Sequence, residues 1–269
     1  MNLKKIGLTA LAGSLVATSV FAGEMTVTGS ASMKVEHVNG GSANAGKSWS
    51  MGNQLEFAGS GELDNGLTVS LNMVLDQNDD STTVAAVHTG APFDSHSVSV
   101  SSDALGTLVF HGEGGSSAQG AIDTTAAGDL WDSSFGITAA QDPAASAMSD
   151  NSIFYTLPTL ADGVALTASY SPKGTGAEAS TAYGIGYTGV EGLSLNYAKG
   201  EDNSAGTTSV PAGVDVTTMK ASYAYGPITI GYSTTEYDSE ATTTTLDQDV
   251  TSYNVSYTVS DNISVSYGS

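Results

Sequence analysis

The chain has 269 residues, with 28 aspartates and glutamates against seven lysines, and it contains neither arginine nor cysteine. Its formal net charge of −21 excludes nucleic acid as a partner, because such binding requires basic side chains that displace counterions. The lack of cysteine excludes a disulfide framework.

Residues 1–22 are predicted to be a secretory signal peptide. The segment MNLKKIGLTALAGSLVATSVFA places Lys4 and Lys5 before an apolar stretch, and cleavage is expected after Ala22. A transmembrane helix would need about 20 strongly apolar residues, whereas Gly, Ser and Thr dilute this one. The sequence therefore predicts an exported protein whose mature domain spans 23–269.

From residue 25 onward the chain alternates apolar and polar side chains, which is the pattern of strands with two different faces. In the first segment Met25, Val27 and Val35 fall on one face, and Thr26 and Lys34 on the other. Thirteen such strands are predicted, at 25–38, 49–61, 67–76, 94–102, 107–112, 151–157, 164–170, 181–187, 193–199, 215–223, 228–237, 249–259 and 263–268. A short helix is possible only within 119–140.

The connections alternate in length. Short turns rich in Gly, Asp and Asn are predicted at 62–66, 102–106, 159–163, 188–192, 224–227 and 260–262. Longer polar loops are predicted between them, at 39–48, 77–93, 113–150, 171–180, 200–214 and 238–248. In an up-and-down antiparallel sheet this order gathers the short turns at one rim and the long loops at the other.

Alternation alone also fits a soluble β-sandwich. Export, unequal loops and aromatic residues near the ends of apolar rows favour an all-β, antiparallel up-and-down transmembrane β-barrel. The polar face would then line a wet lumen, and the apolar face would meet lipid or a neighbouring subunit. The predicted lumen-lining residues are Lys34, Glu36, Gln54, Glu56, Asn72 and Asp76.

Several stretches resemble the general porins of Gram-negative bacteria, in the order in which that family carries them. These are EMTVTGSASMKVE, FAGSGELDNGLTVSLNMVL, LGTLVFHGE, NSIFYTLPTLADGVALTASYSPKG and SYAYGPITIGYSTTEYD. The resemblance covers about 23–269. It implies a homotrimeric, sixteen-stranded outer-membrane channel with lipid and lipopolysaccharide as neighbours.

In that family the third loop narrows the pore, and its counterpart here is 113–150. The pore-constricting acids that the resemblance implies are Glu113, Asp123, Asp129, Asp132 and Asp142. The family usually sets a cluster of arginines against such acids, and this chain has none. Lys34 is the only base on the early lumen faces, so we expect weak transverse polarisation and a preference for cations.

The function predicted from these features is passive diffusion of small hydrophilic solutes and ions through a water-filled pore. A solute-selective channel for a sugar or peptide on the same fold is one alternative, and a secreted β-rich surface or adhesion protein is another. An enzyme is not expected, because no nucleophile elbow or metal-ligand spacing is present. No cofactor is expected, although the loop acids could bind Ca²⁺.

The resemblance also implies sixteen strands, of which about thirteen are present. We therefore expect a fragment that is incomplete at its C-terminus. A barrel lacking strands should remain open, because its two edge strands would keep unpaired backbone groups.

Overall fold

The computed structural model describes residues 25–38, 46–76, 93–122, 126, 146, 150–172, 179–203, 213–239, 247–261 and 263–269. The predicted signal peptide at 1–22 lies outside these ranges, as does most of the segment in which a short helix was predicted. Residues 119–122 within that segment form a turn. Within the described residues, no helix has the length and apolarity needed to cross a membrane.

Thirteen antiparallel strands form one sheet in simple chain order, from β1 to β13. Their bounds are β1 (Met25–Val38), β2 (Gly46–Glu62), β3 (Thr68–Asp76), β4 (Ser95–Ser102), β5 (Gly106–Glu113), β6 (Ser152–Thr156), β7 (Val164–Ser171), β8 (Ser180–Tyr187), β9 (Leu193–Asp202), β10 (Val214–Tyr225), β11 (Ile228–Ser239), β12 (Gln248–Ser260) and β13 (Ile263–Gly268). The prediction of thirteen up-and-down strands in an unclosed sheet is confirmed.

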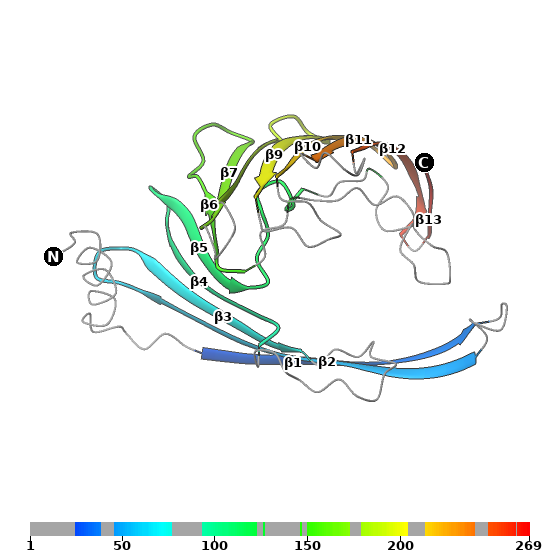
Figure 1. Cartoon of the computed structure of the whole chain (residues 1–269). Helices are drawn as coiled ribbons and strands as arrows, with labels where there is room; N and C mark the ends of the chain where they lie inside the picture. Colours follow the sequence, from blue (N-terminus) through cyan, green and yellow to red (C-terminus); the bar gives the residue numbers. More distant parts are fainter. Residues whose placement is uncertain are drawn as a thin grey trace.

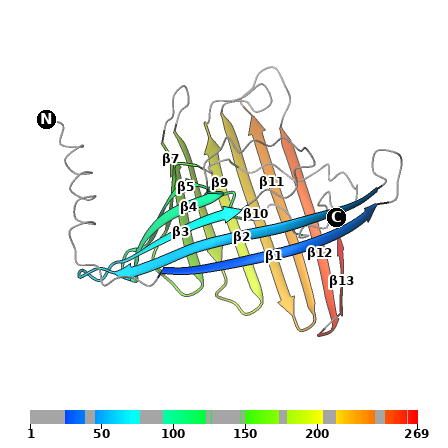
Figure 2. The same ribbon diagram turned by 90° about the horizontal axis from the view of Figure 1, so that it is seen from below.

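The sheet is strongly curved, so that β1–β3 lie opposite β9–β12 (Figure 1). Seen from below, β9–β13 run side by side, with short connections at their lower ends (Figure 2). Each strand pairs only with its neighbours in the chain, and β1 and β13 are the two edges of the sheet among the described residues. This topology brings the alternating side chains of every strand onto two continuous faces.

Glycines with positive φ make the short turns possible. Gly106 has φ 77° and Gly192 has φ 76°, a region that L-residues with a Cβ rarely occupy. A Cβ on Gly106 would lie 2.2 Å from the carbonyl oxygen of Thr156, and one on Gly192 would lie 2.2 Å from that of Ala224. These two turns therefore need glycine both for conformation and for the close approach of the next strand.

The two faces of the sheet differ sharply in chemistry. On the concave side, which we call the inner face, the register aligns Ala198, Thr218 and Thr235 across β9, β10 and β11. On the outer face, Tyr197 lies opposite Met219 on the side of the short turns, whereas Lys199 and Glu236 flank the aligned residues on the side of the long loops. Because side chains alternate along a strand, the pairing fixes each face without ambiguity.

Candidate functional site

The inner face of β1–β3 carries a fixed carboxylate at Glu56. Thr28 lies opposite Glu56 on β1, and its Oγ1 donates to Glu56 Oε2 at 3.5 Å. From β3, Asn72 Nδ2 donates to Glu56 Oε1. Three adjacent strands thus hold this carboxylate, and the structure brings together two of the predicted lumen residues, Glu56 and Asn72.

The other predicted lumen residues take register positions in the same alternation. Gln54 pairs with Ser30 on β1 and with Asp76 on β3. Lys34 pairs with Ser50, and Glu36 with Ser48. The side chains of Lys34, Glu36 and Asp76 lie outside what the structure describes, so their lumen role stays a prediction.

Of the predicted constriction acids, only Glu113 falls within the described residues. It ends β5, where it pairs with His96 across a β-bulge, and its side chain is half-buried. Asp123, Asp129, Asp132 and Asp142 lie outside the described residues. At the base of the same connection, the Gly114 amide donates to Asp150 Oδ1 at 3.3 Å, which ties the two ends of the segment together.

The described parts of the 113–150 connection lie against the inner face of β7–β12. Gln119 is fully buried, with 0% exposure, and its Nε2 donates to Thr218 Oγ1 on β10 at 2.9 Å. Its Oε1 accepts the backbone N–H of Ser146 at 2.7 Å. One amide side chain therefore joins the start of the loop, the end of the loop and the wall.

Further hydrogen bonds extend this attachment along the wall. The Ala118 amide donates to Ser169 Oγ on β7 at 2.9 Å. The Ala126 amide donates to Ser252 Oγ on β12 at 2.6 Å. Two described parts of the connection, Ala118 and Ala126, are thus bonded to inward-pointing serines on β7 and β12.

Small residues create the space that the loop fills, and we call Ala182, Gly184, Ala198, Gly200 and Thr218 the loop seat. A Cβ on Gly200 would lie 2.4 Å from Ser146 Oγ. A Cβ on Gly184 would lie 3.3 Å from the carbonyl oxygen of Ala118. Any side chain at residue 200 would therefore require Ser146 or the strand to shift.

Next to the loop seat, on the side of the short turns, the inner face of β9–β12 is polar and partly exposed at Asn196 and Lys220, whereas Ser233 is fully buried. Lys220 follows Thr218 on the same face of β10, pairing with Asn196 on β9 and Ser233 on β11. Asn196 Nδ2 donates to Ser194 Oγ at 3.2 Å. This wall therefore carries amides, hydroxyls and one ammonium group, whereas the wall of β1–β3 carries the Glu56 carboxylate and, by register, Lys34.

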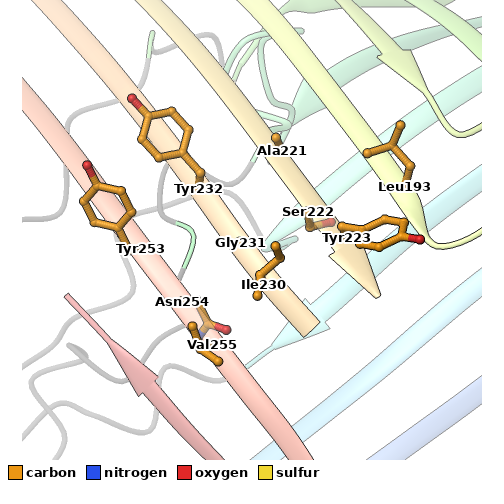
Figure 3. Close-up of a pocket in the computed structure, with 10 residues that line it drawn as sticks. All are labelled: Leu193, Ala221, Ser222, Tyr223, Ile230, Gly231, Tyr232, Tyr253, Asn254 and Val255. Atoms are coloured by element: carbon orange, nitrogen blue, oxygen red, sulfur yellow. The ribbon is translucent and has the colours of Figure 1, made fainter. Parts of the chain in front are cut away.

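The outer face of the same strands is apolar and rich in tyrosine. The rings of Tyr232 and Tyr253 lie with their centroids 5.4 Å apart. Together with Tyr223, Ile230 and Val255 they border a groove of about 370 Å³ (Figure 3). Large apolar side chains with a polar tip suit the boundary between hydrocarbon and water.

No feature of the described residues suggests a bound metal. Across the described ranges, His, Asp and Glu never gather in groups of three or more that could hold a metal ion. The predicted Ca²⁺-binding acids lie mostly outside those ranges. Calcium binding by the loop therefore stays a prediction.

The predicted site residues did not include the loop seat or Lys220. Alternation of the predicted strand at 215–223 is enough to put Thr218 and Lys220 on one face, so this signal was present in the sequence. The partner of Thr218 could not be predicted from the sequence, because Gln119 is 99 residues away in a segment without periodicity.

Comparison with known proteins agrees with this arrangement. A family model described as Gram-negative porin matches residues 7–269. Two engineered variants of the Rh. blastica porin share 14% of residues, with TM-scores of 0.50 and 0.52. A third solved structure, described as "Asymmetric conductivity of engineered proteins", shares 16% with a TM-score of 0.50. Each comparison covers 91% of this chain and 93% of the other.

At such identities the likeness to these structures establishes the fold. A search of curated proteins gives no match.

Proposed function

Because the chain belongs to the Gram-negative porin family, an outer-membrane channel family, we propose that it forms a water-filled pore that passes small hydrophilic solutes and prefers cations. The observation that carries the cation preference is the Glu56 carboxylate, fixed on the inner face by Thr28 and Asn72. Rings and patches of carboxylates at a pore wall raise the local concentration of cations and lower that of anions.

The overall charge supports the same direction. The chain carries 28 acids and seven lysines, with no arginine. The loop acids Asp123, Asp129, Asp132 and Asp142 belong to this proposal as further pore-facing carboxylates. A fixed negative potential attracts cations over about one Debye length, which is about 10 Å at 0.1 M salt, so acids in a narrow passage act on every passing ion.

The attachment of the loop supports a pore that stays narrowed rather than one that opens widely. Gln119 and Thr218 are both fully buried, at 0% exposure, and buried hydrogen bonds are costly to leave unmade. We propose that 113–150 is a constriction held in place by its seat. A homotrimer surrounded by outer-membrane lipid and lipopolysaccharide is the assembly that we propose for this pore.

A passive pore is favoured over a sugar-selective one by the chemistry of the described inner wall. Its described aromatic side chains are His111, Phe154 and Tyr237. Phe154 packs against Ala118 of the loop, and Tyr237 is buried beside Val214 and Val216. Across the described strands, no row of exposed rings follows the inner face, whereas stacking on a sugar needs such a row.

Three measurements test this function. Liposomes holding the purified protein should admit sugars at rates that fall smoothly with solute size, and saturable uptake of one solute would instead indicate a selective channel. In a KCl gradient across a planar bilayer, the reversal potential should report K⁺ as the more permeant ion. Release of the protein from membranes by high salt would contradict an integral pore and favour a peripheral surface protein.

A further inference from the structure

The groove on the outer face of β9–β12, with a volume of about 370 Å³, plays no part in the pore (Figure 3). Its lining includes Ala221, whose side chain is much smaller than those around it. Ala221 pairs with Leu195 on β9 and with Tyr232 on β11, and Met219 and Tyr223 flank it on the same face of β10. The hollow therefore follows from one small residue set among large ones.

The apolar surface around the groove does not stop at its edges. On the same face, Ile185 of β8 is 44% exposed and Val265 of β13 is 61% exposed. A docking surface for another protein is usually an apolar centre enclosed by a polar rim. An apolar band that continues over neighbouring strands is instead typical of the surface that a membrane barrel turns toward lipid. The groove is part of such a band, so a hydrocarbon chain is the occupant that fits it.

The direction of the groove suits a lipid chain. Strands of membrane barrels are tilted by about 35–45°, so a chain that lies along the membrane normal passes from one strand to the next. The groove likewise extends across strands, from Leu193 on β9 to Val255 on β12. Leu193 is the first residue of β9 and pairs with Tyr223 near the end of β10, so this end of the groove lies at the short turns. The occupant therefore belongs to the leaflet on the short-turn side.

The rim next to this end of the groove is acidic. Every predicted short turn except 224–227 carries an aspartate or a glutamate, and none carries a lysine, arginine or histidine. Glu191 is exposed and precedes Leu193 by two residues, so the two Cα atoms lie within about 7 Å of each other. Lys199, a base on the outer face of β9, lies toward the long loops, with its Nζ 3.3 Å from Asp215 Oδ2. A headgroup at the short-turn end therefore meets carboxylates.

We propose that the groove holds one acyl chain of a phospholipid and that Glu191 binds the ammonium group of its headgroup, so that the site prefers ethanolamine lipids to glycerol lipids. An ethanolamine headgroup carries an ammonium beside its phosphate, whereas a glycerol headgroup carries the phosphate charge alone, which the acidic rim repels. The preference should be about threefold, because an ion pair exposed to water is weak. The inference concerns the outer face and holds for either ion selectivity of the pore.

Quenching of a single tryptophan by brominated lipid measures which lipid occupies the groove. The two tryptophans of the chain, Trp49 and Trp131, are replaced by phenylalanine. Tyr253→Trp then places the probe in the groove lining, and Val98→Trp, at an exposed outer-face position of β4, is the matched control. The vesicles contain equal amounts of phosphatidylethanolamine and phosphatidylglycerol, and only one of the two has brominated chains. At the groove probe, the occupancy ratio should favour phosphatidylethanolamine about threefold, and at the control probe it should be one.

Two pairs of variants separate the headgroup from the chain. Glu191→Gln should bring the ratio at the groove probe to one, whereas Asp103→Asn, in the turn between β4 and β5, should leave it unchanged. Ala221→Leu fills the groove and should reduce quenching by both lipids, whereas Ala168→Leu, at an outer-face position of β7, should not. A preference that survives Glu191→Gln, or equal quenching by both lipids before that change, would overturn the headgroup assignment.

The same probe distinguishes lipid from a second subunit. If another copy of the chain covered the groove, neither brominated lipid would quench the tryptophan at residue 253, and that result would overturn the lipid site. Single-channel conductance of the Tyr253→Trp protein in a planar bilayer shows separately that the pore is intact. A closed or absent pore would contradict the proposed function, whereas an intact pore with an unquenched probe would contradict the lipid site alone.

Discussion

The two walls of the curved sheet share the same strand pattern but have different roles. The wall of β8–β11 is built from small and hydroxyl-bearing residues, and the loop covers it so completely that Ala198, Thr218 and Thr235 are 0% exposed. The wall of β1–β3 carries long polar side chains, and its carboxylate Glu56 is only partly buried. The wall of β8–β11 holds a segment of the chain in place, and the wall of β1–β3 presents a carboxylate to the interior.

This difference shows that the polar face of a strand need not be a solvated face. Residues 117–119 are buried, and their polar groups bond to Ser146 of the same loop as well as to Ser169 and Thr218 of the wall. Buried polar groups in proteins are almost always hydrogen-bonded. Glycine and alanine supply the room for the loop, and serine and threonine supply the bonds that hold it.

The difference between the two walls should be lost most completely when a bulky side chain fills the loop seat. Gly200→Val should displace the loop, because even a Cβ would lie 2.4 Å from Ser146 Oγ, and overpacking of this kind costs about 1–3 kcal/mol of folding stability. With its attachment lost, the loop should extend into the interior and reduce the single-channel conductance. Thr181→Val, at the same level on the outer face, is the matched control and should conduct normally. Unchanged conductance in Gly200→Val would contradict the seat.

A smaller effect is expected from removing the buried amide. Gln119→Leu leaves the Ser146 N–H without its acceptor, and an unsatisfied buried group costs about 1–3 kcal/mol. The variant should unfold at a lower temperature, and its loop should be cut faster by a protease. The double variant with Thr218→Val should be less destabilised than the sum of the two single changes, because the residues share one bond. Strict additivity of the two changes would contradict a shared attachment.

A change on the wall of β1–β3 should alter ion selectivity and leave folding stability almost unchanged. Glu56→Gln keeps the size of the side chain and removes one negative charge, so it should lower the K⁺ to Cl⁻ permeability ratio by about twofold in 0.1 M salt. Glu236→Gln removes an equal charge from the outer face of β11 and should leave the ratio unchanged. If both variants gave the same shift, the distinction between the two faces would be wrong.

The strands were predictable because period-two alternation depends only on neighbouring residues. The predicted segment at 263–268 coincides with β13 (Ile263–Gly268), and that at 164–170 differs from β7 by one residue. The prediction ended too early at 199, because Gly200, Glu201 and Asp202 lack an apolar face. In the structure β9 continues to Asp202, which pairs with Val214, since backbone hydrogen bonds do not require alternation.

The site was predictable only in part, for a physical reason. Glu56 and Asn72 belong to regular strands, so their common face follows from the register of one hairpin. The contact between Gln119 and Thr218 depends instead on the path of a loop without periodicity. Glycine and alanine at the loop seat also resemble ordinary strand residues, because what matters there is the side chain that is absent.

The most direct test of the inner-face assignment measures Glu56→Gln, Lys220→Gln and the double variant as single channels in the same low-salt KCl gradient. We expect the reversal potential to move toward anions in Glu56→Gln and toward cations in Lys220→Gln. In the double variant, we expect it to return close to that of the unchanged channel. Shifts in the same direction, or no shift in either single variant, would contradict the placement of Glu56 and Lys220 on the face that lines the pore.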